Sequence, residues 1–249
     1  MCIRDRSYVD EQVGKIVKTL KETGMWDNTV LVFSSDHGDM IGERGLWFKK
    51  TLFDPAVRVP MIIRIPDRSA QRIKAPVSLI DLLPTFTELA GIPPQELVTK
   101  IEGRSLLPLL DKDDPERITY CEHLDGAVTA PRVMLRKGSW KLVFSEAYPA
   151  QLYDLSTDPN ELNNLADAHA HEAKLNELLA EVRKTWDLDS LREDVIRNQK
   201  MRTMVYRALN KGKEQEWDVE PNAPALMKFV RGNDMFPELE RVRYLPYSD

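Results

Sequence analysis

The sequence predicts an α/β protein in three consecutive parts, and three observations carry that prediction. An unbroken apolar run at residues 30–33, a few residues after a helical pattern, is typical of a strand buried in a helix-covered parallel sheet. Short strand-like runs separated by turns indicate a small antiparallel sheet further on. A last stretch is rich in proline and charge. We therefore expect a sheet core at residues 7–115, an antiparallel sheet with a helix at 116–186, and an extended tail at 187–249.

The first expected element is an amphipathic helix at residues 7–23. Its apolar side chains recur every three or four residues and share one face: Val9, Val13, Ile16, Val17 and Leu20. Ser7 can cap the start of this helix, and Gly24 can adopt the left-handed conformation that ends it. Residues 1–6 show no such period, so we expect them to be foreign to the native chain.

Two apolar strands and a second helix complete the expected core. The strands lie at residues 29–35 and 59–65, and a helix at 80–90 is ended by Gly91. The polar loop at residues 36–54 is long for a compact domain, and loops of that length are commonly functional.

The second part alternates strands and turns. The expected strands lie at residues 118–122, 132–136, 140–144 and 151–155. Residues 137–139, Lys-Gly-Ser, are a candidate hairpin turn between the second and third of these strands. A helix at 168–186 follows, and a basic helical pattern at 191–209 opens the tail.

The composition argues against several classes of partner. The chain has 40 acidic and 35 basic residues without long blocks of either sign, which argues against a nucleic-acid-binding surface. No apolar run reaches the length of a membrane span. Two cysteines cannot form a disulfide framework and no secretion signal opens the chain, so a cytoplasmic location is the default expectation.

Polar side chains follow the first strand directly. Asp36 and His37 stand where open α/β sheets place ligands and catalytic groups, and a carboxylate with an imidazole can bind a metal ion. Lys49, further along the loop, can offer a cation to an anionic substrate. Alternatively, Asp36 caps a turn and Lys49 is a solvated surface charge. Position and residue type together favour a site for a metal and an oxyanion.

Four ordered blocks resemble one family of hydrolases. Residues 34–49 are similar to the second conserved block of the type I sulfatases, within the alkaline-phosphatase superfamily. Residues 58–63 and 81–85 resemble the strand and helix that come next in that family. Residues 152–166 resemble its C-terminal subdomain. The resemblance runs from Tyr8 to the end of the chain and implies an alkaline-phosphatase-like sheet core.

The resemblance also implies roles for the loop residues. Asp36 and His37 take metal-ligand positions for Ca²⁺ or Mg²⁺, and Lys49 matches the sulfate-binding lysine. His37 could instead hydrogen-bond the substrate, because imidazole is a poor Ca²⁺ ligand. Lys49 and His37 are thus the candidate catalytic residues of a sulfate monoester hydrolase, in which a cation and a lysine stabilise charge on the ester oxygens.

The nucleophile of such an enzyme is not evident in this sequence. The family makes formylglycine from the cysteine of a Cys-x-Pro/Ala-Ser-Arg motif. Cys2 has Arg6 four residues on but lacks the other motif residues, and Cys121 has no suitably spaced arginine. We therefore interpret the chain as the C-terminal half of a sulfatase, an inactive fragment whose formylglycine lies in a missing N-terminal half.

Two features resemble the choline-sulfatase group. Asp125 precedes a Gly-x-x-x-Ala-Pro pattern, and it, or alternatively Glu122, would contact the ammonium of choline sulfate. The tail resembles one that reaches into an adjacent subunit, which implies a homo-oligomer. Two alternatives stay open: a phosphonate or phosphodiester hydrolase of the same superfamily, or a fragment that acts only in assembly.

Overall fold

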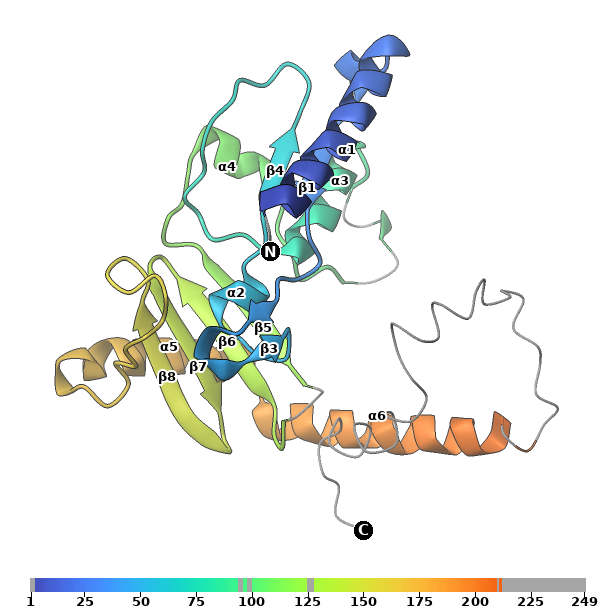
Figure 1. The fold of residues 1–249 in the computed structure, drawn as a ribbon. Helices are drawn as coiled ribbons and strands as arrows, with labels where there is room; N and C mark the ends of the chain where they lie inside the picture. The colour runs from blue at the N-terminus through green and yellow to red at the C-terminus, as the bar shows by residue number, and fades with distance from the viewer. Residues whose placement is uncertain (1–2, 94–95, 98–99, 125–127, 210, 212–249) are drawn as a thin grey trace. The chain divides into compact units, whose positions relative to one another are not determined.

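The computed structural model of this protein describes residues 3–93, 96, 97, 100–124, 128–209 and 211 (Figure 1). The chain divides into two compact units, Met1–Arg117 (unit 1) and Ile118–Asp249 (unit 2). Each unit has its own elements and is described by itself. The sequence led us to expect three parts, and that division stays a prediction. The second and third of these parts both fall within unit 2.

Unit 1 alternates helices with short strands. In chain order its elements are α1 (Ile3–Glu22), β1 (Leu31–Ser34), β2 (Met40–Ile41), β3 (Trp47–Phe48), α2 (Asp54–Val57), β4 (Met61–Arg64), α3 (Leu82–Leu89) and α4 (Leu107–Asp111), with short 3₁₀ turns at Trp26–Asn28, Glu43–Gly45 and Leu79–Asp81. Both expected strands and both expected helices of the core are present, within a few residues of their expected ends.

Strand β1 pairs with β4 in an antiparallel ladder, with Leu31 opposite Arg64 and Ser34 opposite Met61. The expectation that the apolar run belongs to a parallel pair is therefore wrong for β1 and β4. The chain between them forms a hairpin and one helical turn, and not the long covering crossover that parallel neighbours require. An apolar run favours burial but carries no information about strand direction, and by the described residues β1 is only half-buried.

Helix α1 begins earlier than expected and is less buried. It starts at Ile3, because polar residues can extend a helix beyond its apolar stripe. That residues 1–6 are foreign to the native chain stays a prediction. None of its residues is buried by the described parts of the chain, and Ile16 is 56% exposed.

A buried polar centre holds the second half of unit 1 together. Asp81, at the start of α3, accepts hydrogen bonds from the backbone N–H groups of Ser78 and Arg104 and from the guanidinium of Arg117, at 2.8, 2.9 and 2.9 Å. The Asp81 and Arg117 side chains are both almost fully buried. The bond with Ser78 is part of the capping box of the 3₁₀ turn at Leu79–Asp81, and the bond with Arg117 pairs two buried charges.

Unit 2 is a four-stranded antiparallel meander followed by two helices. The strands are β5 (Ile118–His123), β6 (Arg132–Lys137), β7 (Trp140–Ser145) and β8 (Tyr148–Asp154), in the spatial order β5-β6-β7-β8. The helices are α5 (Glu172–Thr185), after a 3₁₀ turn at His169–His171, and α6 (Leu188–Leu209). All four predicted strands, the hairpin turn at 137–139 and both helical patterns are confirmed.

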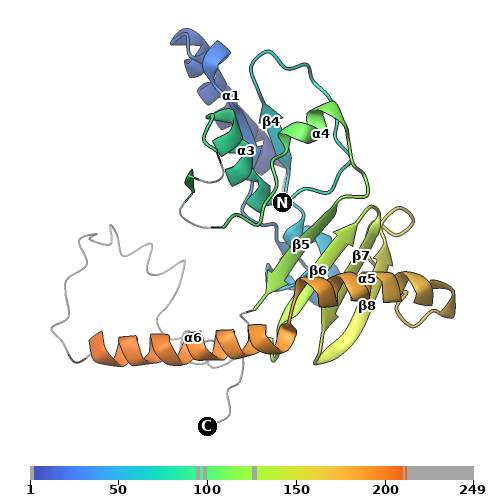
Figure 2. The same ribbon diagram turned by 180° about the vertical axis from the view of Figure 1, so that it is seen from behind.

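Helix α5 lies across one face of this sheet (Figure 2). The core between them consists of alternate strand residues and the apolar stripe of the helix: Val133, Leu135, Leu142, Leu152, Leu178, Val182 and Leu188. Each strand sends every second side chain into this layer, as the pleat dictates. On α6, only Leu188 is buried by the described residues, and the tail beyond Lys211 lies outside them.

Within the described residues of unit 2, one ion pair is buried. Lys141 Nζ lies 2.6 Å from Glu161 Oε1, and their side chains are 0% and 1% exposed. Glu161 adopts a left-handed backbone conformation with φ of 56°. Such a conformation costs free energy for a residue other than glycine, so the surrounding contacts must hold it in place.

Within the described residues, no helix is long and apolar enough to cross a membrane.

Candidate functional site

Asp36, His37 and Lys49 come together in the loop after β1, and we call these three residues the loop cluster. His37 Nε2 lies 2.5 Å from Lys49 Nζ and 3.4 Å from Asp36 Oδ2. Asp36 and His37 follow β1, whereas Lys49 follows β3, and the β2–β3 hairpin returns the chain to bring the lysine back. The predicted loop residues are therefore neighbours in the structure.

The His37 ring is oriented by its own backbone surroundings. Its Nδ1 lies 2.7 Å from the Gly38 carbonyl oxygen. A carbonyl can only accept, so Nδ1 carries the proton and Nε2 has a lone pair that faces the Lys49 ammonium. The Lys49 ammonium donates to this lone pair. This tautomer is the one in which a histidine can accept from a cation or ligate a metal.

Asp36 is an exposed carboxylate in an electropositive setting. Its side chain is 84% exposed, and its Oδ1 accepts from the His37 backbone N–H at 2.9 Å. That backbone hydrogen bond lowers the pKa of Asp36, and the positive charge of Lys49 also lowers it. The carboxylate is therefore ionised at neutral pH and open to a cation.

The loop is anchored against α2 by a glycine. The Gly38 N–H donates to the Ala56 carbonyl at 2.8 Å, and a Cβ at Gly38 would lie 2.0 Å from the Pro55 carbonyl oxygen. In the same part of the chain, Met40, Leu52 and Ala56 are almost fully buried. Sequence reasoning missed Gly38 as a site residue. Its place directly after Asp36 and His37 was the available signal, because close backbone approach is a common reason for glycine at a site.

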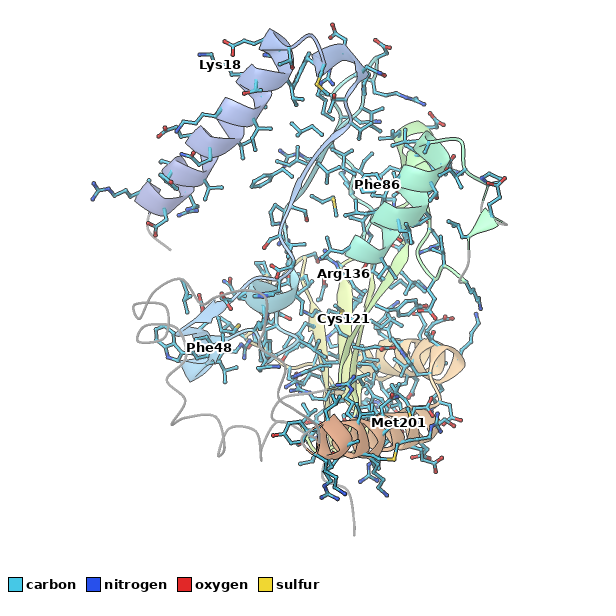
Figure 3. The ribbon with its side chains drawn as sticks, turned by 90° about the vertical axis from the view of Figure 1, so that its right-hand side faces the viewer. Lys18, Phe48, Phe86, Cys121, Arg136 and Met201 are labelled. Atoms are coloured by element: carbon cyan, nitrogen blue, oxygen red, sulfur yellow. The ribbon has the colours of Figure 1, made fainter. Side chains whose placement is uncertain are left out.

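The β2–β3 hairpin has an unusual backbone. Arg44 and Phe48 adopt left-handed conformations with φ of 57° and 66°, in addition to two glycines. Glu43 closes the hairpin by accepting from the Ile41 backbone N–H at 2.6 Å. Phe48 directly precedes Lys49 and is largely exposed on this hairpin (Figure 3). Left-handed residues other than glycine are enriched at functional sites.

The loop cluster fits only part of a metal shell. Among the residues that the structure describes, no group of three or more His, Cys, Asp and Glu side chains is arranged to hold a metal ion. Asp36 and His37 offer two donors, whereas Ca²⁺ takes about 6–8 oxygen ligands. Further ligands would have to come from another segment.

The two candidate ammonium-binding residues belong to unit 2. The Glu122 carboxylate accepts from the Trp186 indole N–H at 2.5 Å, and the ring of Trp186 meets that of Tyr120 edge to face at 5.1 Å. Glu122 is thus a carboxylate bonded to the edge of one aromatic ring, which in turn packs against a second. Asp125 lies outside the described residues.

Comparisons with known proteins agree with the loop motif and the tail. Residues 3–92 match the model of the sulfatase family, and residues 193–244 match that of the choline sulfatase enzyme C terminal. The chain is 37% identical to a choline-sulfatase of Rhizobium meliloti (strain 1021), over 98% of this chain and 48% of that protein. It is 34% identical to arylsulfatase K of Gallus gallus, over 63% of this chain and 31% of that protein. The chain thus spans about half the length, or less, of these relatives.

Solved structures resemble the fold as well. The phosphonate monoester hydrolase SpPMH from Silicibacter pomeroyi superposes with a TM-score of 0.61 and 31% identity, covering 71% of this chain and 38% of that one. A 2-O GAG sulfatase superposes with a TM-score of 0.63 and 27% identity, covering 76% and 42%. Both likenesses extend over most of this chain.

Proposed function

Because this chain belongs to the sulfatase family, we propose that its loop cluster is part of the site at which a sulfuric ester hydrolase binds and cleaves a sulfate monoester. The contact of Lys49 Nζ with His37 Nε2, beside the Asp36 carboxylate, carries the proposal. A cationic donor and an exposed carboxylate at a strand end suit an oxyanion bound next to a divalent cation.

Each residue of the loop cluster has a distinct role in this proposal. The Lys49 ammonium has three N–H donors, of which His37 accepts one, so two are left for oxygens of the ester. His37 orients the lysine, and Asp36 contributes one ligand to Ca²⁺ or Mg²⁺. The bound cation supplies stabilisation of the negative charge that develops as the S–O bond breaks.

We place the nucleophile in a segment that the relatives have and this chain does not match. Neither Cys2 nor Cys121 stands in a Cys-x-Pro/Ala-Ser-Arg motif, and the described residues hold at most two metal ligands. Formylglycine and the remaining ligands would complete the site from that segment. This chain by itself is then expected to show no hydrolysis of an aryl sulfate.

A hybrid enzyme tests the proposal. In it, this chain replaces the matching 48% of the Rhizobium meliloti choline-sulfatase. The hybrid should hydrolyse sulfate esters, and Lys49→Ala should lower kcat by roughly 100- to 1,000-fold, the usual cost of one preorganised charge contact. Lys50→Ala, which removes the adjacent positive charge, is the control and should stay within a few-fold of the parent. Equal activity of the two variants would remove Lys49 from the site.

We further propose that the substrate is choline sulfate. Support comes from the similarity to a choline-sulfatase, the match of the tail, and the Trp186 ring beside Glu122, which packs against Tyr120. A carboxylate and aromatic faces are the groups that hold a quaternary ammonium. In the hybrid, Glu122→Gln combined with Asp125→Asn should lower kcat/KM for choline sulfate but not for 4-nitrophenyl sulfate. An unchanged ratio of the two values would refute the choline assignment.

A phosphonate or phosphodiester hydrolase is the second candidate, favoured by the likeness to the phosphonate monoester hydrolase from Silicibacter pomeroyi. The same loop cluster could bind a phosphonate oxygen. Comparing kcat/KM of the hybrid for a phenyl phosphonate monoester and for choline sulfate decides between the two. A higher value for the phosphonate would replace the sulfatase proposal.

We also propose that the tail at residues 187–249 joins copies of the chain into a homo-oligomer. On α6, Met204, Tyr206 and Leu209 are largely exposed, as is Met201 (Figure 3). Exposed apolar side chains gathered on one helix are typical of an interaction surface. The match of residues 193–244 to a C-terminal family model supports a specialised role for this segment.

A further inference from the structure

A small cavity lies at the β7–β8 edge of the sheet in unit 2. Its volume is about 270 Å³, and its polar lining comes from two strands, the start of a third and the loop after β8: Arg132, Ser145, Tyr148, Gln151 and Asn164. Val143, Phe144 and Pro149 form the apolar remainder. The cavity is slightly smaller than the range of about 300–1,000 Å³ usual for drug-sized ligands, so it suits a small one.

A β-bulge shapes this cavity. Val143 stands opposite Gln151, but Ser145 stands opposite Tyr148, so two residues of β8 face Phe144 alone. One of the two is Pro149, which has no N–H to donate to the ladder and is tolerated at bulges. The bulge breaks the alternation of side chains along β8. As a result Tyr148, Pro149 and Gln151 line the same cavity.

Two walls of the cavity are fixed by hydrogen bonds. Asn164 accepts from the Leu152 N–H at 2.9 Å and donates to the Ala150 carbonyl at 3.1 Å, so it pins the loop to β8. The Tyr148 hydroxyl bonds the Thr129 hydroxyl at 2.6 Å. These groups give the cavity its form before any ligand arrives.

Two other donors of the lining, Arg132 and Gln151, have no carboxylate or carbonyl partner of this kind among the described residues. Among the described residues, no carboxylate forms an ion pair with Arg132, whose guanidinium lies 5.9 Å from the centre of the Tyr148 ring. Within the same residues, no hydrogen bond involves the Gln151 side-chain amide. The Ser145 hydroxyl accepts weakly from Ala147 N–H at 3.4 Å and can still donate. Partial burial of Arg132 without a counter-charge is unfavourable, which an anion would relieve.

We propose that this cavity binds a small oxyanion, which accepts hydrogen bonds from the Arg132 guanidinium, the Gln151 side-chain amide and the Ser145 hydroxyl. A guanidinium matches the two oxygens of a carboxylate or a sulfate in a bidentate arrangement. The anion could be inorganic sulfate, which hydrolysis of a sulfate ester releases, or a small carboxylate. No step of the proposed hydrolysis uses these residues, so a test of anion binding in this cavity is independent of a test of that reaction.

Titration of this 249-residue chain followed by NMR tests the site. Sodium sulfate and sodium acetate are added separately at constant ionic strength, with sodium chloride as the balancing salt. A saturable shift of the Arg132 Nε–H and Gln151 side-chain amide signals is expected for at least one of them. Tighter saturation by sulfate identifies the inorganic anion, and tighter saturation by acetate identifies a carboxylate. Shifts that do not saturate with either anion, or that chloride alone reproduces, would overturn the proposal.

Variants link the binding to Arg132. Arg132→Gln should weaken binding at least roughly tenfold, the effect of losing charged hydrogen bonds. Arg183→Gln removes the same charge from the exposed side of α5 and should bind as the parent does. If Arg132→Gln fails to fold, Arg132→Lys keeps the charge but loses the guanidinium and should also weaken binding. Parent-like affinity in the folded Arg132 variants would exclude this residue as the ligand contact.

Discussion

Removing the charge of Lys141 should destabilise unit 2 far more than removing any exposed lysine. Lys141 Nζ and Glu161 Oε1 are 2.6 Å apart, and both side chains are inaccessible to solvent. In Lys141→Met the volume of the side chain is similar, but the Glu161 carboxylate stays buried without the ammonium of Lys141. Breaking a buried pair from one side costs about 3–5 kcal/mol. At about 2–4 °C per kcal/mol, this loss of stability corresponds to a fall in the Tm of unit 2 of roughly 10 °C or more.

The assay is thermal and urea unfolding of this 249-residue chain, followed by the NMR methyl signals of Leu135 and Leu142, which report on the core of unit 2. Lys184→Met is the matched control, because its ion pair with Glu181 is 3.8 Å long and Lys184 is 77% exposed. That control should change the free energy of unfolding by less than about 1 kcal/mol.

A double variant separates the charge effect from packing. Lys141→Met with Glu161→Gln removes both charges, and its loss of stability should be smaller than the sum of the two single losses. A Lys141→Met protein that unfolds within about 1 kcal/mol of the parent would refute the reasoning. It would mean that water or another cation compensates the carboxylate.

Three further outcomes follow from the structure. Gly38→Ala should separate the loop from α2, because its Cβ would meet the Pro55 carbonyl at 2.0 Å, and should shift the His37 ring signals in NMR; Gly14→Ala, with open space around it, is the control and should not. The Asp36 carboxyl should titrate below its ordinary 3.8 in a carbon-detected NMR series. Folding lowers the pKa of Asp36, so its contribution to stability is present above the pKa of the unfolded chain and is lost as pH falls through the pKa of the folded one. Asp36→Asn should therefore weaken the dependence of the free energy of unfolding on pH in the acid range. A titration midpoint of Asp36 that is not lowered would contradict this. Deleting residues 187–249 from the hybrid should reduce its mass in light scattering, and an unchanged mass would mean that the tail folds on its own subunit.

How far the sequence predicts the fold depends on which contacts an element makes. The four strands of unit 2 were predictable, because neighbouring hairpins leave their period and turns in the local sequence, as at Gly138 with its φ of 58°. The start of β8 was not, since Pro149 hides a bulge that only cross-strand pairing reveals. The antiparallel pairing of β1 and β4 was missed for a similar reason: strand direction is set by the intervening chain and leaves no trace in an apolar run.

The candidate site shows the same limit. The loop cluster was predictable from residue types at a strand end together with a family motif, and the structure brings Asp36, His37 and Lys49 together. The support beneath it was not predictable, because the contact of Gly38 with Pro55 joins backbone atoms seventeen positions apart. The metal roles, and those of Glu122 and Asp125, stay predictions.

The meander of unit 2 has a consequence for the order in which the chain folds. Each of its strands pairs only with its neighbour in sequence, so its contacts are local and cost little chain entropy to close. Strand β1, in contrast, must wait for β4, with Leu31 pairing to a residue 33 positions away. Unit 2 is therefore expected to form its strand pairs faster than unit 1 forms its β1–β4 pair when the unfolded chain refolds.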